Sequence, residues 1–185
     1  MRALRILGLT LLLVLPSCLA PGSRADDEIE RVYDPCAGIS VQAASDTTEA
    51  ELVAIDRAIE MWMQVADLRF SRDRARPFEQ VLPIHFEEAS LVFRGVYQDQ
   101  IGDVVINRRL VDPDEQAITI AHELGHAIGL LHIETRDSVM NSGNLVLLPL
   151  ATDVDALSEL WGPCVRDNRD LAQPQQLDIK TPSPQ

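Results

Sequence analysis

The sequence predicts an α+β fold, in which short strands and amphipathic helices build one domain. Apolar residues recur at intervals of three and four over residues 49–67, as on the buried face of a helix. Short segments rich in β-branched residues indicate strands between this helix and a second one that begins near Asp112. The 185 residues suffice for one domain with a substantial core and are too few for two. We expect this domain over residues 33–165.

The first helix has a defined start in the sequence. Thr48 and Glu51 have the spacing of a capping box, in which each residue satisfies a backbone N–H near the other. Trp62 lies on the apolar face of the helix, which favours a place in the core over a role in binding.

Three segments are expected to form strands. The first covers residues 38–41 and the second residues 81–86, where Pro83 weakens the pattern. An arginine-rich connection over residues 71–77 is expected to be solvated. The third strand follows a loop at residues 99–103 and consists of Val104, Val105, Ile106 and Asn107.

Two further helices are expected in the second half of the chain. Asp112, followed by a proline and two acids, is a typical start, and this helix should continue to about Leu130. The last helix should begin after Thr152 and end at Trp161, before a glycine and a proline. The polar, proline-containing tail over residues 166–185 is expected to be disordered.

The N-terminus is typical of an exported protein. Residues 1–17 are expected to form a signal peptide, because a basic start precedes an apolar run too short to span a membrane. Residues 15–18, Leu-Pro-Ser-Cys, are similar to the lipobox of bacterial lipoproteins. Cys18 is therefore expected to carry a lipid that anchors the chain in a bacterial cell envelope, with residues 18–32 as an acidic tether. Ordinary secretion with cleavage between Ala20 and Ala25 is the alternative.

Charge and cysteine content restrict the partners and the compartment. The formal net charge of −13 argues against a nucleic-acid partner, and the membrane is expected to be contacted only through the N-terminal lipid. Assigning Cys18 to the lipid leaves Cys36 and Cys164 as an even pair in an oxidising compartment. We expect these two to form a disulfide, and two separate buried thiols are the alternative.

The segment HELGHAIGLLH, from His122 to His132, has the residue types and spacing of a metal site. His122 and His126 are four apart and so project from one face of a helix. Gly129 allows the chain to leave the helix and return His132 to the same point. Three imidazoles with an open fourth position are typical of one catalytic zinc ion. Isolated histidines are usually core or surface residues, but a chance match to this pattern is rare.

Glu123 is the expected general base of this site. A zinc ion lowers the pKa of its bound water to about 7, and Glu123 could take the proton of that water and pass it to a leaving amine. The sequence contains nothing that supports a calcium site. The expected reaction is therefore hydrolysis of an amide in a protein or peptide substrate.

The motif is similar to the metzincin signature HExxHxxGxxH, and Ser138-Val139-Met140 resembles the methionine turn of that family. The resemblance implies that Met140 forms an apolar floor under the histidines. Residues 38–41, 58–70 (AIEMWMQVADLRF) and 153–162 (DVDALSELWG) resemble the early strand, the tryptophan-containing helix with its following strand, and the late helix of matrixins. Among metzincins the chain is thus most similar to bacterial matrixin-like proteases. This likeness implies a twisted mixed sheet, two main helices at a zinc cleft and a C-terminal helix in a small lower subdomain.

The chain also departs from the matrixin pattern. Outside the motif, His85 is the only histidine, so the structural zinc of animal matrixins is not expected and His85 is interpreted as an ordinary strand residue. Residues 35–38, Pro-Cys-Ala-Gly, superficially resemble a cysteine switch, but the disulfide is favoured for Cys36.

The resemblance further implies how a substrate would bind. It places an extended substrate antiparallel to an edge strand, here Val104, Val105, Ile106 and Asn107. The apolar residues 145–148 follow the methionine turn and are expected to form a specificity pocket wall, unless they are core. We thus expect a zinc-dependent endopeptidase. The alternatives are a surface lipoprotein that retains zinc without peptidase activity, and a zinc amide hydrolase acting on a cell-wall cross-link.

Overall fold

The computed structural model describes residues 29–72, 80–143, 146–162 and 165. The predicted signal peptide, Cys18, most of the tether, most of the 71–77 connection and the tail lie outside these residues. The described elements are, in chain order, β1 (Ile39–Ala43), α1 (Glu49–Val65), β2 (Phe70–Ser71), β3 (Gln80–Glu87), β4 (Gly95–Gln98), β5 (Asp103–Asn107), α2 (Pro113–Ala127) and α3 (Ala151–Trp161). The mixture of one sheet and three helices confirms the predicted α+β class.

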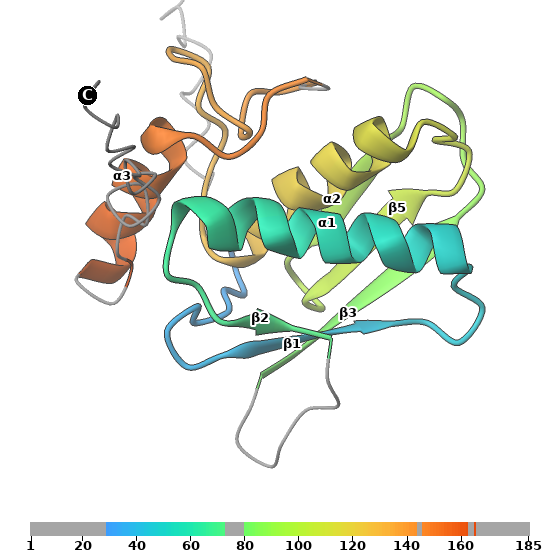
Figure 1. The fold of residues 1–185 in the computed structure, drawn as a ribbon, viewed down its shortest axis with the longest axis horizontal. Helices are drawn as coiled ribbons and strands as arrows, with labels where there is room; N and C mark the ends of the chain where they lie inside the picture. The colour runs from blue at the N-terminus through green and yellow to red at the C-terminus, as the bar shows by residue number, and fades with distance from the viewer. Residues whose placement is uncertain (1–28, 73–79, 144–145, 163–164, 166–185) are drawn as a thin grey trace, which may run out of the picture.

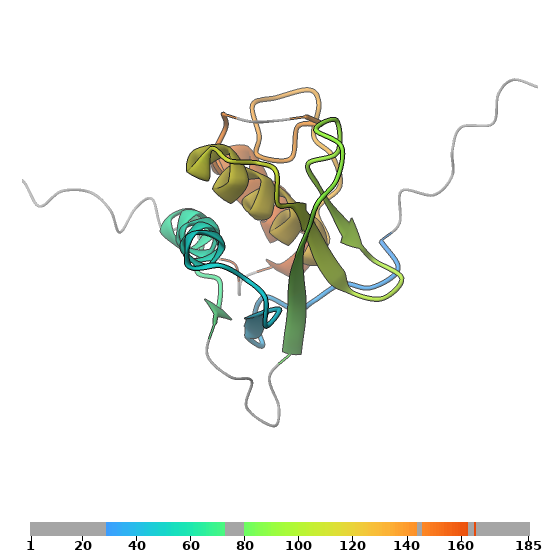
Figure 2. The same cartoon turned by 90° about the vertical axis from the view of Figure 1, so that its right-hand side faces the viewer.

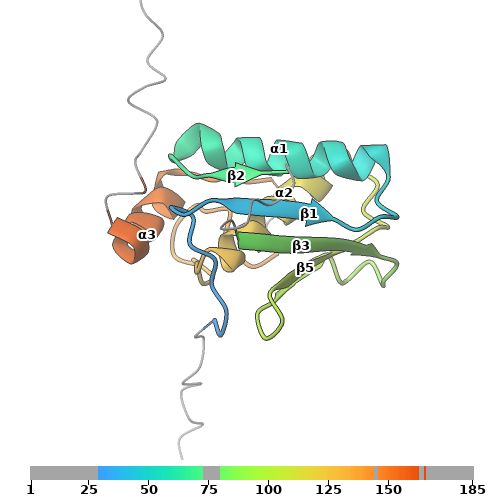
Figure 3. The ribbon, with the colours of Figure 1, turned by 90° about the horizontal axis from the view of Figure 1, so that it is seen from below.

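The five strands form one mixed sheet in the order β2-β1-β3-β5-β4. β1 pairs in parallel with β2 and β3, and β3 pairs in parallel with β5. Of these five strands, β4 alone runs antiparallel to its neighbour. Seen from below in Figure 3, β2, β1, β3 and β5 lie side by side in this order.

The structure corrects the predicted edge strand. Val104, Val105, Ile106 and Asn107 belong to β5, which pairs with β3 on one side and with β4 on the other. Their backbone groups are therefore used inside the sheet. The edge next to β5 is β4, which the sequence analysis did not predict because its four residues, Gly95–Gln98, are too few to show a clear alternation.

Pro83 lies within β3 and does not interrupt it. Its register partner is Gln42 of β1, whereas pairing with β5 begins one residue later, at Ile84. Pro83 therefore has a neighbouring strand on one side only, which is where a residue without an N–H is tolerated in a sheet.

The helices α1 and α2 cover the same face of the sheet (Figures 1 and 2). The predicted capping box at the start of α1 is present, since the side chains of Thr48 and Glu51 each accept from the other residue's backbone N–H. Trp62 is fully buried, and its Nε1 donates to the carbonyl oxygen of Ala121 in α2 at 2.8 Å. The prediction that Trp62 is a core residue is confirmed, and its hydrogen bond ties the two helices together.

α3 lies at one end of the molecule, beyond the ends of α1 and α2 (Figure 1). It begins at Ala151, slightly earlier than predicted, because the carboxylate of Asp153 accepts from the backbone N–H of Leu150 at 2.7 Å. It ends at Trp161, as expected, with Gly162 at a φ of 65°. Among the described residues, no helix combines the length and apolar character needed to cross a bilayer.

The domain begins before Tyr33, the expected boundary. Ile29 packs against the core, and the backbone N–H of Glu30 donates to the Asp99 carboxylate at 3.0 Å. The Arg31 guanidinium donates to the carbonyl oxygen of Ile101 at 2.6 Å. The end of the predicted tether is thus attached to the loop between β4 and β5.

Candidate metal centre and cleft

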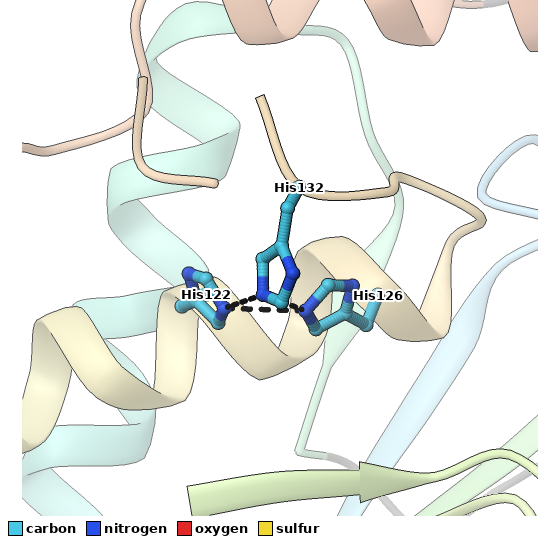
Figure 4. Close-up of side chains that lie close together, drawn as sticks. All are labelled: His122, His126 and His132. Carbon is cyan, nitrogen blue, oxygen red and sulfur yellow. Dashed lines mark hydrogen bonds between the residues drawn. The ribbon is translucent and has the colours of Figure 1, made fainter. Parts of the chain in front are cut away.

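His122 and His126 project from α2 toward one point, and His132 reaches that point from the segment after the helix (Figure 4). α2 starts as the sequence predicts, because the Asp112 side chain accepts from the backbone N–H groups of Asp114 and Glu115. It ends at Ala127, three residues before the expected end.

The early end of α2 is produced by Gly129. Gly129 adopts a φ of 96°, and its N–H donates to the carbonyl oxygen of His126 at 2.9 Å. The N–H of Leu130 donates to the carbonyl oxygen of Gly125 at 2.9 Å. This pair of bonds is a Schellman motif, which requires a residue in the left-handed region. The reversal that was predicted for Gly129 is present and brings His132 back to α2.

The three imidazoles meet through their Nε2 atoms. The Nε2 of His126 lies 3.2 Å from that of His122 and 3.3 Å from that of His132, and the third separation is 3.3 Å. The Nδ1 of His122 donates to the carbonyl oxygen of Val139, and the Nδ1 of His126 to that of Leu130, both at 2.7 Å. Since a carbonyl only accepts, these bonds fix the tautomer and leave a lone pair on each Nε2.

This arrangement fits a tetrahedral metal ion. Imidazole nitrogens bind zinc at about 2.0–2.1 Å, so two ligands at the tetrahedral angle lie about 3.3–3.4 Å apart. The observed separations of 3.2 and 3.3 Å agree with this value. Lone pairs converging at such distances repel each other unless a cation or proton lies between them. His122, His126 and His132 are thus close enough to hold a metal ion.

The protonation states also suit metal binding. Burial lowers the pKa of His122, although its bond to the Val139 carbonyl acts in the opposite direction. Burial, assisted by the nearby His122, lowers the pKa of His126 to about 4. Both side chains are therefore neutral at pH 7, which is the form that binds a metal.

Met140 is fully buried beside the segment of α2 that carries His122 and His126. A Cβ atom on Gly125, between the two helical histidines, would overlap with the Met140 sulfur and lie 3.2 Å from Trp62. The glycine therefore allows Met140 and Trp62 to approach the helix backbone. This packing is compatible with the floor role that the family resemblance implies for Met140.

A buried carboxylate connects the methionine turn to α3. Asp153 is fully buried and accepts from the Ser138 hydroxyl and from the Val139 N–H, the latter at 3.2 Å. The carbonyl of the same Val139 accepts from His122. Asp153 is thus linked to His122 through Val139, a connection that the sequence analysis missed because the contact is non-local.

Glu123 and the three histidines line a cleft of about 760 Å³. Only 6% of Glu123 is exposed. Burial raises its pKa to about 8, and the nearby Tyr97 N–H has a smaller, opposite effect. β4 comes close here because Gly95 has no side chain: a Cβ on Gly95 would lie 2.9 Å from Thr119 and 3.2 Å from the Glu123 Cγ.

The cleft wall contains residues that the sequence analysis did not single out. They come from the end of the tether, the segment before β4, β4 itself, the loop after β4 and the turn after α2, and include Ile29, Val92, Arg94, Val96, Asp99 and Leu131. These residues are far apart in the sequence, so the sequence alone does not indicate that they lie together. The one local signal is that Val96 and Tyr97 favour a strand. The predicted pocket wall at residues 145–148 differs: Leu145 lies outside the described residues, and Val146, Leu147 and Leu148 do not line this cleft.

The remaining predicted residues lie away from the metal centre or outside the described parts. His85 lies in β3, 3.4 Å from Asp103, as a half-exposed strand residue. Cys36 is disulfide-bonded. Its predicted partner Cys164 and the predicted lipid anchor Cys18 are not among the described residues.

No protein-family model matches the chain, and a search of curated proteins finds no match.

Proposed function

We propose that this protein is an exported zinc-dependent endopeptidase of the metzincin type, similar to bacterial matrixin-like proteases. The observation that carries the proposal is the convergence of His122, His126 and His132, with Nε2 separations of 3.2 and 3.3 Å, beside the buried Glu123. The three histidines would hold one zinc ion. When bound, the ion would supply a Lewis acid that polarises a carbonyl and makes water acidic.

Glu123 is the proton carrier in this proposal. It accepts a proton from the attacking water and delivers it to the amine nitrogen as the peptide C–N bond breaks. In the protein without metal, burial keeps the pKa of Glu123 near 8. A cation on the neighbouring histidines would favour the carboxylate and so the base form.

The substrate would bind as an extended strand along β4. Bonds from Asn107 N–H to the Arg94 carbonyl and from Gly102 N–H to the Gln98 carbonyl direct these two carbonyls toward β5. Because backbone groups alternate in direction along a strand, the N–H and C=O groups of Gly95 and Tyr97 point away from β5. Apart from the Tyr97 N–H, which faces the Glu123 carboxylate, these groups are available to an antiparallel peptide above Glu123. This role replaces the one that the sequence analysis gave to Val104–Asn107.

Metal analysis and cleavage assays test this function. We expect the purified protein to contain one zinc per chain, to lose cleavage of a peptide library on chelation and to regain it with zinc. His126→Gln should lose the metal, and His85→Gln, outside the cluster, should keep it. Undiminished cleavage by the metal-free protein would contradict the proposal. Hydrolysis of peptidoglycan fragments alone would identify a cell-wall amide hydrolase instead.

A further inference from the structure

The cleft carries a cationic side chain at one end of β4. Arg94 directly precedes β4 and lines the cleft together with Thr119 and Glu123. Among the described cleft residues it is the only arginine or lysine. Its Nη1 donates to the carboxylate of Glu115 in α2, and the two side chains remain 34% and 30% exposed.

The position of Arg94 along the cleft follows from α2. Glu115, Thr119 and Glu123 are spaced four residues apart and so lie on one face of the helix. Gly95 packs against Thr119 and Glu123. Arg94 pairs with Glu115, which lies one helical turn before Thr119. Glu123 follows Glu115 by eight positions, which corresponds to about 12 Å along the helix axis.

Arg94 retains capacity to bind a second carboxylate. A guanidinium has five N–H donors in a fixed fork, and Glu115 accepts from one nitrogen. Within the described parts of the chain, Glu115 is the only carboxylate that pairs with Arg94. The partly exposed remainder of the fork matches the geometry of a carboxylate.

We propose that Arg94 is a specificity-determining residue that binds a carboxylate of the substrate on the C-terminal side of the scissile bond. This inference rests on the proposed peptidase function. An antiparallel peptide directs its C-terminal half toward the start of β4, where Arg94 lies. At about 3.3 Å per residue, 12 Å corresponds to about three or four residues beyond the scissile bond. The carboxylate comes from an Asp or Glu side chain or from a free C-terminus.

Peptide pairs that differ in one charge test this assignment. One series carries Glu or Gln at each of the four positions after the scissile bond, and a second series has a free or an amidated C-terminus. We expect kcat/KM to favour the acidic member by about five- to tenfold at one position. If the free C-terminus alone gives the preference, the carboxylate is that of the chain end.

Two variants should shift the preference in opposite directions. Arg94→Gln should reduce the ratio of the two kcat/KM values to about one. Glu115→Gln should increase it, because Arg94 then loses its competing carboxylate. Arg109→Gln, which removes an exposed arginine outside the cleft lining, should leave the ratio unchanged. A ratio that persists in Arg94→Gln would overturn the proposal and leave the peptidase function intact.

Binding to the zinc-loaded Glu123→Gln variant gives a readout without turnover. Calorimetry with the same peptide pairs should show the acidic preference, and adding Arg94→Gln should abolish it. Equal affinities for every pair would refute the role of Arg94. Binding with the expected preference but no cleavage by the wild type would instead refute the proposed function. If Arg94→Gln does not fold, Arg94→Lys, which keeps the charge without the fork, should show a weakened preference.

Discussion

Glu123 and its neighbour His122 are adjacent in sequence but have different roles in the proposed site. The Nε2 of His122 points at the other two histidines, whereas the Glu123 side chain lies against Gly95 and Tyr97 of β4. Because Glu123 is outside the ligand set, its removal separates metal binding from proton transfer.

Glu123→Gln should therefore retain zinc and lose turnover. The amide has nearly the same shape but cannot accept a proton, and we expect kcat to fall by about 10²- to 10⁴-fold. Metal content and peptide cleavage, measured on the same preparation, check this result. Glu134→Gln is a suitable control, because Glu134 is an exposed carboxylate whose side chain accepts from the Ser142 N–H. A wild-type rate for Glu123→Gln would show that another group acts as the base.

At the level of the elements, α3 is attached to the metal centre through Asp153. Its two carboxylate oxygens accept from Ser138, Val139 and Leu150 in a fully buried setting. An unsatisfied donor at such a place costs about 1–3 kcal/mol.

Asp153→Asn should consequently destabilise the fold and weaken metal binding together. The amide nitrogen would face a backbone or hydroxyl donor, so the free energy of unfolding should fall by about 1–3 kcal/mol. Loosening Val139, which holds the His122 ring, should lower zinc affinity by about 10- to 100-fold. Urea unfolding and metal competition measure the two effects, with Asp155→Asn on the exposed side of α3 as the control. An unchanged zinc affinity would disprove the link.

The elements also differ in how far the sequence predicts them. α1 and α2 are marked by local signals, namely the Thr48 capping box and the Asp112 cap, and both start where predicted. The order of strands in the sheet has no local signal, so Val104–Asn107 was placed at the edge although it pairs on both sides. The convergence of His122, His126 and His132 was predictable because the three lie within one motif. Arg94 and Asp153 were not, because their partners are distant in sequence.

At the scale of the whole molecule, the predicted disulfide would join the start of the domain to its end. Cys36 precedes β1 and is disulfide-bonded, and 127 residues lie between it and its predicted partner Cys164. Closing so long a loop removes much of the conformational freedom of the unfolded chain.

Reduction should thus lower the free energy of unfolding by about 4–5 kcal/mol. Thiol titration of the denatured, unreduced protein should detect no free thiol from Cys36 and Cys164. A Cys18→Ser variant removes the third cysteine and serves as the reference for both measurements. Two reactive thiols in that variant would contradict the pairing.

The compact spacing of the three converging histidines has a consequence for the rate of folding. Three histidines, His122, His126 and His132, lie within eleven residues of chain. None of them belongs to a strand, so they can come together before the sheet forms. Loops of about ten residues close in about 10–100 ns, long before distant strands pair. In the proposed site, zinc would therefore bind a partly formed α2 and its turn and act as a folding nucleus.

We expect stopped-flow refolding from urea to accelerate when zinc is present at a concentration equal to that of the protein. His126→Gln should refold at one rate with or without the ion. If zinc slows unfolding and leaves refolding unchanged, the histidines come together only after the sheet has assembled. In the expected case, availability of the metal in the compartment where the chain folds would determine how quickly the protein matures.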